Sequence, residues 1–134
     1  MKISDIWDRE KLFREVFLLA KVKRNKQQYE DLTESALNVF QRADNSLIKS
    51  PLEEYLTNLD LEELKVIKTV MYIGRDRDYR DNESFQERYD YMWNYLNRKG
   101  WGTKELEVEI LCGKTPLDDY LEEGCQILGF RIAI

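Results

Sequence analysis

Apolar side chains recur along this chain with the spacing of amphipathic helices. In the first segment they follow steps of three, four and seven residues and so share one helical face: Ile6, Phe13, Val16, Phe17 and Ala20. Ser4 precedes this stripe and is the expected N-cap. A second stripe consists of Tyr29, Leu32, Ala36, Leu37 and Phe40 and ends before a polar segment at 44–46.

Two consecutive cap signatures mark the next helices. Ser50-Pro51-Leu52-Glu53 places serine at the cap, proline at the first helical position and glutamate at the third. Asp60 is the expected N-cap of the next segment, which has apolar residues on nearly every side: Leu64, Val66, Ile67, Val70, Met71 and Ile73. Because such a helix must be covered by its neighbours, we expect residues 60–74 to be the central element.

The second half of the chain predicts three more helices and a tail. One helix follows the polar stretch 75–82 and stops at Gly100, with Phe85, Tyr89, Met92, Trp93 and Leu96 on its apolar face. Another helix is expected to begin at Thr103 and end at Gly113. The last is expected to begin at Thr115-Pro116 and end near Gly124. The apolar tail 127–134 should pack back on the helices, as a short strand or irregularly. The prediction is an all-α fold: one domain, 1–134, with six or seven helices bundled around the central one.

The residue types present exclude several chemistries. The 134 residues include no histidine and only two cysteines, Cys112 and Cys125. Ser-His-Asp and Cys-His nucleophiles are therefore excluded, and a four-ligand structural zinc site lacks donors. Both cysteines stand among apolar residues and are expected to be small buried side chains. We expect no cofactor and no metal site, and these absences favour a non-enzymatic protein without deciding the question.

Charge is distributed unevenly. Residues 1–26 carry eight basic and four acidic side chains, whereas residues 27–134 carry 13 basic and 22 acidic ones, for a net charge of −5. This balance disfavours direct nucleic-acid binding. The basic cluster at 21–26 is expected at the end of the first helix, where cations complement the helix dipole. The absence of a long apolar run or signal-peptide pattern predicts a cytoplasmic protein with no membrane partner.

Two motifs could carry chemistry. Gly74-Arg75 ends the central helix, and the Arg75 guanidinium suits either an anionic ligand or a carboxylate on another helix. Gly113-Lys114-Thr115 lacks the upstream glycine of a phosphate-binding loop, and the proline after it removes a backbone donor. The acidic residues that follow are expected mainly as a solvated helix face, or else as a pair for acid–base work or a cation: Asp118, Asp119, Glu122 and Glu123.

Aromatic residues supply the third candidate. Tyr91 and Tyr95 lie one helical turn apart, and Trp101 follows the same helix. Tyrosine and tryptophan are favoured interface anchors, so these three residues are a candidate partner-binding patch. The alternative is that they pack the last helices against the long one.

Two segments carry a resemblance to a known family. Residues 71–75, Met-Tyr-Ile-Gly-Arg, and 110–124, which include Thr-Pro-Leu-Asp-Asp-Tyr-Leu-Glu-Glu-Gly, resemble the uncharacterised bacterial family called domain of unknown function 3775. The similarity spans about residues 52–129. This chain has Asp76 and Arg77 where the family has glycine and aspartate, and Cys125 where it has a leucine-like residue.

The resemblance implies a small helical domain and no known reaction. It singles out one set of residues as a structural or functional cluster: Gly74, Arg75, Asp119, Tyr120 and Glu123. Within it, pairing of Arg75 with Asp119 or Glu123 would tie the central helix to the last one.

Together these features predict an interaction module. We expect a non-enzymatic accessory or inhibitor factor that binds another protein through an acidic, aromatic-bearing surface. The alternative is a small anion- or metal-dependent ligand-binding domain or hydrolase, with Arg75 binding an anion and Asp119 or Glu123 holding a cation.

Overall fold

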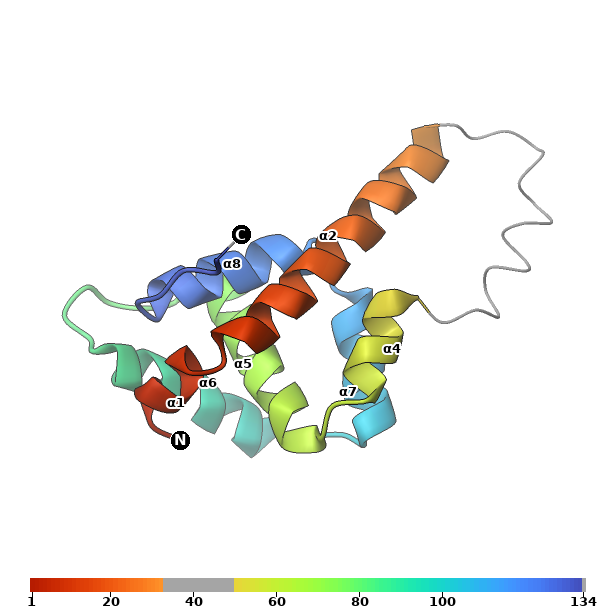
Figure 1. Ribbon diagram of the computed structural model, residues 1–134. Coiled ribbons are helices and arrows are strands. Elements are labelled where there is room, and N and C mark those ends of the chain that lie inside the picture. The colour runs from red at the N-terminus through yellow and green to blue at the C-terminus, as the bar shows by residue number, and fades with distance from the viewer. Residues whose placement is uncertain (33–49, 134) are drawn as a thin grey trace.

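Seven helices make up the described part of the chain. The computed structural model describes the backbone of residues 1–32 and 50–133 and the side chains of residues 1–26 and 50–133. In chain order the helices are α1 (Ile3–Trp7), α2 (Glu10–Leu32), α4 (Pro51–Thr57), α5 (Leu61–Asp76), α6 (Phe85–Lys99), α7 (Lys104–Gly113) and α8 (Leu117–Ile127). Figure 1 shows them bundled around α5, which confirms the predicted all-α fold.

The predicted central helix is the buried one. α5 packs against α6, α7 and α8, and the side chains of Val66, Ile67, Val70 and Met71 are fully buried. The helix continues two residues beyond Gly74 and ends where Arg77 adopts a left-handed conformation with φ of 52°. Between Leu64 and Gly74 only Lys65 and Tyr72 are half-buried and the other residues are buried, so the neighbouring helices cover most of this surface.

Cap chemistry sets the helix starts as expected. The Ser50 hydroxyl accepts a hydrogen bond from the Glu53 N–H at 3.1 Å, and the Asp60 carboxylate accepts one from the Glu63 N–H at 2.8 Å. Thr103 caps α7 in the same way. Each of these side chains satisfies a backbone donor that has no partner within the helix.

The first predicted helix differs from the observed one. Lys2 occupies the N-cap position of α1, so Ser4 is a helical residue and not the cap. α2 runs on to Leu32, because no glycine or proline interrupts residues 8–32, and the cations at 21–26 therefore lie inside a helix and not at its end. Ala36, Leu37 and Phe40 of the second predicted stripe lie outside the described residues, as does the side chain of Tyr29.

The end of the chain also differs in one respect. Gly124 does not break α8, which continues to Ile127. The tail that follows is irregular and packs back as predicted, with Leu128 and Ile132 buried and the Phe130 ring 5.8 Å from that of Phe13. Within residues 1–32 and 50–133, no helix is long and apolar enough to cross a membrane.

Candidate functional site

The Arg75 side chain pairs with its own sequence neighbour. Its Nε donates to the Asp76 carboxylate at 2.8 Å, and this hydrogen bond raises the pKa of the guanidinium. The guanidinium carbon also lies 4.3 Å from the centre of the Tyr72 ring. Arg75 is exposed and forms no ion pair with α8 among the described residues, so the expected pairing with Asp119 or Glu123 is wrong.

Other arginines connect α8 to its neighbours. Arg77 lies 3.6 Å from Glu123, which joins the end of α5 to α8 at the surface. Arg24 of α2 donates to Asp118 at 2.6 Å and lies 3.8 Å from Asp119. The hydrogen bond to Asp118 raises the pKa of Arg24.

The first acidic residue of α8 is not part of a solvated face. The Asp118 side chain is 1% exposed, although the sequence predicted exposure. A buried carboxylate requires a cation partner because desolvation strongly disfavours an isolated charge, and Arg24 supplies that partner. This ion pair fixes α2 against the start of α8.

Of the five residues in the predicted cluster, two meet directly. A Cβ on Gly74 would overlap the carbonyl oxygen of Tyr120, so the backbones of α5 and α8 touch at this point. The remaining three residues take part in three separate ion pairs. The Gly74–Tyr120 contact is a packing feature that brings no free polar group into a cavity.

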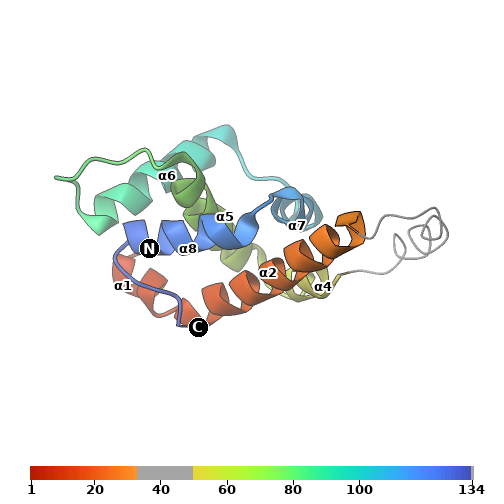
Figure 2. The same cartoon turned by 90° about the horizontal axis from the view of Figure 1, so that it is seen from above.

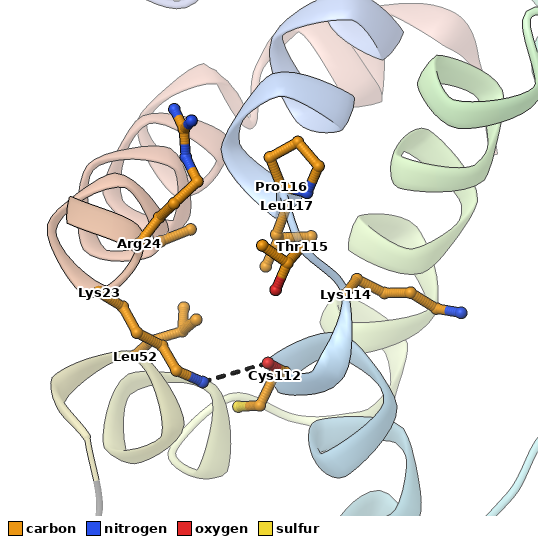
Figure 3. Close-up of a pocket in the computed structure, with 9 residues that line it drawn as sticks. Lys23, Arg24, Leu52, Cys112, Lys114, Thr115, Pro116 and Leu117 are labelled. Atoms are coloured by element: carbon orange, nitrogen blue, oxygen red, sulfur yellow. Dashed lines mark hydrogen bonds between the residues drawn. The ribbon is translucent and has the colours of Figure 1, made fainter. Parts of the chain in front are cut away.

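A small hollow lies at the turn between α7 and α8 (Figure 3). Lys23, Arg24, Lys114 and Thr115 contribute to its lining, and its volume of about 40 Å³ would admit only a few water molecules. Lys23 donates to the Cys112 carbonyl at 3.1 Å, and Figure 3 shows the Lys114 ammonium pointing away from the hollow. Its cations are therefore engaged by the protein or directed elsewhere.

The hollow offers no activated nucleophile. The Cys112 thiol is half-buried, and burial raises its pKa, so it remains protonated at neutral pH. Among the described residues, no group of three metal-ligating side chains is present. Arg75 and Asp119 line neither this hollow nor a second one between α4 and α7.

The three aromatic residues of the predicted patch separate into two places. Tyr91 and Tyr95 are 52% and 38% exposed, on the side of α6 opposite to the buried Tyr89 and Leu96. Trp101 instead packs 5.3 Å from Trp93 and donates its indole N–H to Asn97 at 3.0 Å. It does not extend the surface formed by the two tyrosines.

A different group of exposed aromatic residues lies beside Arg88. The Trp7 and Phe85 rings meet edge to face at 6.3 Å, and the Arg88 guanidinium carbon lies 4.4 Å from the Tyr79 ring and 5.6 Å from that of Phe85. We call these four residues the aromatic cluster. Trp7, Tyr79 and Phe85 are 39%, 39% and 40% exposed. Figures 1 and 2 both place α1, the segment before α6 and the C-terminal tail at this same end of the molecule.

The aromatic cluster is held in place by hydrogen bonds to backbone carbonyls. Arg88 donates to the carbonyls of Ile127 and Arg80 at 2.9 and 3.0 Å, and the Trp7 indole donates to the Leu128 carbonyl at 2.8 Å. A Cβ at Gly129 would lie 2.6 Å from the Phe85 ring, so that ring packs closely on the tail. These contacts fix the Trp7 and Phe85 rings at the surface.

Sequence patterns did not reveal this cluster. The pattern places Phe85 on the buried stripe of α6, whereas Trp7 and Tyr79 belong to no stripe.

A comparison of the chain with protein-family models, curated proteins and solved structures finds no match.

Proposed function

We propose that this protein is an interaction module that binds another protein through the aromatic cluster. Tryptophan, tyrosine and arginine are the residue types that most often dominate binding energy at interfaces. Here Tyr79 and Phe85 flank Arg88, Trp7 packs on Phe85, and each of the three aromatic residues is about two-fifths exposed. This gathering of Trp7 with the distant Tyr79 and Phe85 is the observation that carries the proposal.

The proposed role is that of an accessory or inhibitor factor in the cytoplasm. The acidic balance of the chain would steer it toward a partner with a basic surface and disfavours direct binding to nucleic acid. The resemblance of residues 71–75 and 110–124 to domain of unknown function 3775 would imply a small helical domain and adds no reaction.

An affinity-capture experiment with two matched double variants tests the proposal. Trp7→Ser with Tyr79→Ser removes two rings of the aromatic cluster, and Tyr91→Ser with Tyr95→Ser removes two exposed rings from the outer side of α6. Tagged full-length proteins are expressed in the source cells, and captured proteins are quantified by mass spectrometry. Thermal unfolding monitored by circular dichroism confirms that both variants fold.

The expected result is a protein that wild type and the α6 variant retain and the aromatic-cluster variant loses. Loss with the α6 variant alone would move the interface to Tyr91 and Tyr95. Retention by the aromatic-cluster variant, or failure of the wild type to retain any protein, would overturn the proposal.

A further inference from the structure

α2 has a second face that no described helix of the same chain covers. Its inner face packs against α8 and α4. Five residues on the opposite face, which we call the α2 outer face, recur at helical spacing and are all exposed: Leu18, Lys21, Val22, Asn25 and Lys26. Val22 is 62% exposed. Figure 1 shows the C-terminal half of α2 extending away from the other helices.

This face combines apolar and positive side chains. The chain has no acidic residue between positions 16 and 26, although acidic residues outnumber basic ones by 26 to 21 overall. Leu18 and Val22, one turn apart, form a small apolar strip beside Lys21. An acidic surface would complement the exposed lysines of this face.

A surface of that kind lies elsewhere on the same chain. Glu53 and Thr57 of α4 and Lys104, Glu105 and Val108 of α7 line a hollow of about 150 Å³, which we call the α4–α7 groove. Glu54 and Glu109, both exposed, add two more carboxylates on the same two helices. Lys104 is the one cation among the described residues of the lining, and its apolar member, Val108, is buried.

We propose that the α2 outer face of one copy of this protein binds the α4–α7 groove of a second copy. The inner face of α2 is already held by α8 and α4, so its outer face points away from its own bundle. Two copies related by a twofold axis would form this contact twice, since each copy supplies one basic face and one acidic groove. The inference is independent of the aromatic cluster, which lies on other elements.

Sedimentation of the full-length protein tests this dimer. At about 50 mM salt the expected mass is twice the chain mass of 16.1 kDa, and at about 500 mM salt the dimer should dissociate, because salt screens exposed charges. A 16.1 kDa species at every concentration in low salt would overturn the proposal. A dimer unaffected by salt would also overturn it.

Charge reversal identifies the surfaces. Lys21→Glu with Lys26→Glu makes the α2 outer face acidic, and Glu105→Lys with Glu109→Lys makes the groove basic. Each variant alone should sediment as a monomer because like charges then face each other at both contacts. An equal mixture of the two variants should form a dimer, since opposite charges meet at both contacts of the mixed pair.

A third variant controls for total charge. Arg98→Glu with Lys99→Glu reverses two exposed cations of α6 and should leave the wild-type dimer intact. Circular dichroism verifies that all variants are helical. Dimers in either single-surface variant, or no dimer in the mixture, would overturn the assignment of these surfaces. The Trp7→Ser variant with Tyr79→Ser should remain dimeric, which separates this test from that of the proposed partner interface.

Discussion

Gly74 of α5 lies directly against the backbone of Tyr120 in α8. A Cβ on Gly74 would overlap the Tyr120 carbonyl oxygen and lie 2.7 Å from the Gly124 nitrogen. Gly124 has the reciprocal contact, because its Cβ would overlap the Val70 carbonyl oxygen of α5. The two glycines thus allow the central helix and the last one to approach until their backbones meet.

Replacing Gly74 with alanine should destabilise the protein strongly. The added methyl group meets backbone atoms, which cannot rotate away, so the helices must separate and their buried contacts loosen. We expect a loss of about 3 kcal/mol or more in the free energy of unfolding, measured by urea denaturation. Gly113→Ala is the control, because no atom lies within 4 Å of its Cβ position, and its effect should stay within about 1 kcal/mol. Equal stabilities for the two variants would show that the backbones of α5 and α8 are not in close contact at Gly74.

The helices of this fold are largely predictable because their determinants are local. Ser50, Asp60 and Thr103 cap helices in the positions that the sequence indicates, and the predominantly apolar segment before Gly74 is the buried one. The role of Gly124 is not local. A glycine in a helical pattern signals either an end or a close approach, and only the position of Val70 on the other helix decides between them.

A buried ion pair between Lys68 and Glu107 connects α5 to α7. Their charged atoms lie 2.8 Å apart, and Glu107 also accepts a hydrogen bond from the Gly102 N–H at 2.8 Å. Lys68→Met would leave the carboxylate buried without a cation. We expect a loss of about 3–5 kcal/mol in the free energy of unfolding.

The double variant Lys68→Met with Glu107→Gln tests that explanation. Glutamine removes the unpaired charge and keeps an acceptor for Gly102, so stability should recover by most of the loss. Glu62→Ala, which breaks the exposed pair with Lys65, should change stability by less than about 1 kcal/mol. If the double variant is no more stable than Lys68→Met, the cost comes from lost packing and not from the charge.

The candidate site was less predictable than the fold because its contacts are long-range. The family resemblance named Gly74 and Tyr120, which do meet. Arg75, in contrast, pairs with the carboxylate of its sequence neighbour Asp76 and not with one on another helix. Trp7 and Tyr79 are 72 positions apart in the sequence, and no periodic pattern connects them. Only the packing of α1 and the tail around the start of α6 brings these rings to Arg88.

Glu87 should make helix α6 sensitive to acid. The Ser84 N–H donates to the Glu87 carboxylate at 3.0 Å, and this bond lowers the pKa of Glu87 in the folded protein. A carboxyl group with a lowered folded pKa stabilises the protein above its unfolded pKa, and this contribution disappears as pH falls through the folded pKa. Glu87→Gln should therefore lower the thermal midpoint near pH 7, and the difference from wild type should shrink toward about pH 3.

A matched substitution distinguishes this capping effect from general acid sensitivity. Asp81 is exposed in the segment before α6, so Asp81→Asn removes one carboxylate without disturbing a helix cap. The difference in thermal midpoint between this variant and wild type should vary less with pH than the difference for Glu87→Gln. A difference for Glu87→Gln that is constant from neutral to acid pH would contradict a role for the ionised carboxylate.

The two thiols should differ in reactivity with a disulfide reagent. Cys125 is fully buried, whereas Cys112 is half-buried, and burial raises the pKa of both thiols. Because the thiolate is the reactive form, the native protein should label slowly at neutral pH, at Cys112 only, and faster as pH rises above the usual thiol pKa of about 8.5. Cys112→Ser should abolish native labelling, and denatured wild type should expose both thiols. Rapid labelling of native Cys125 at neutral pH would contradict its burial in the core.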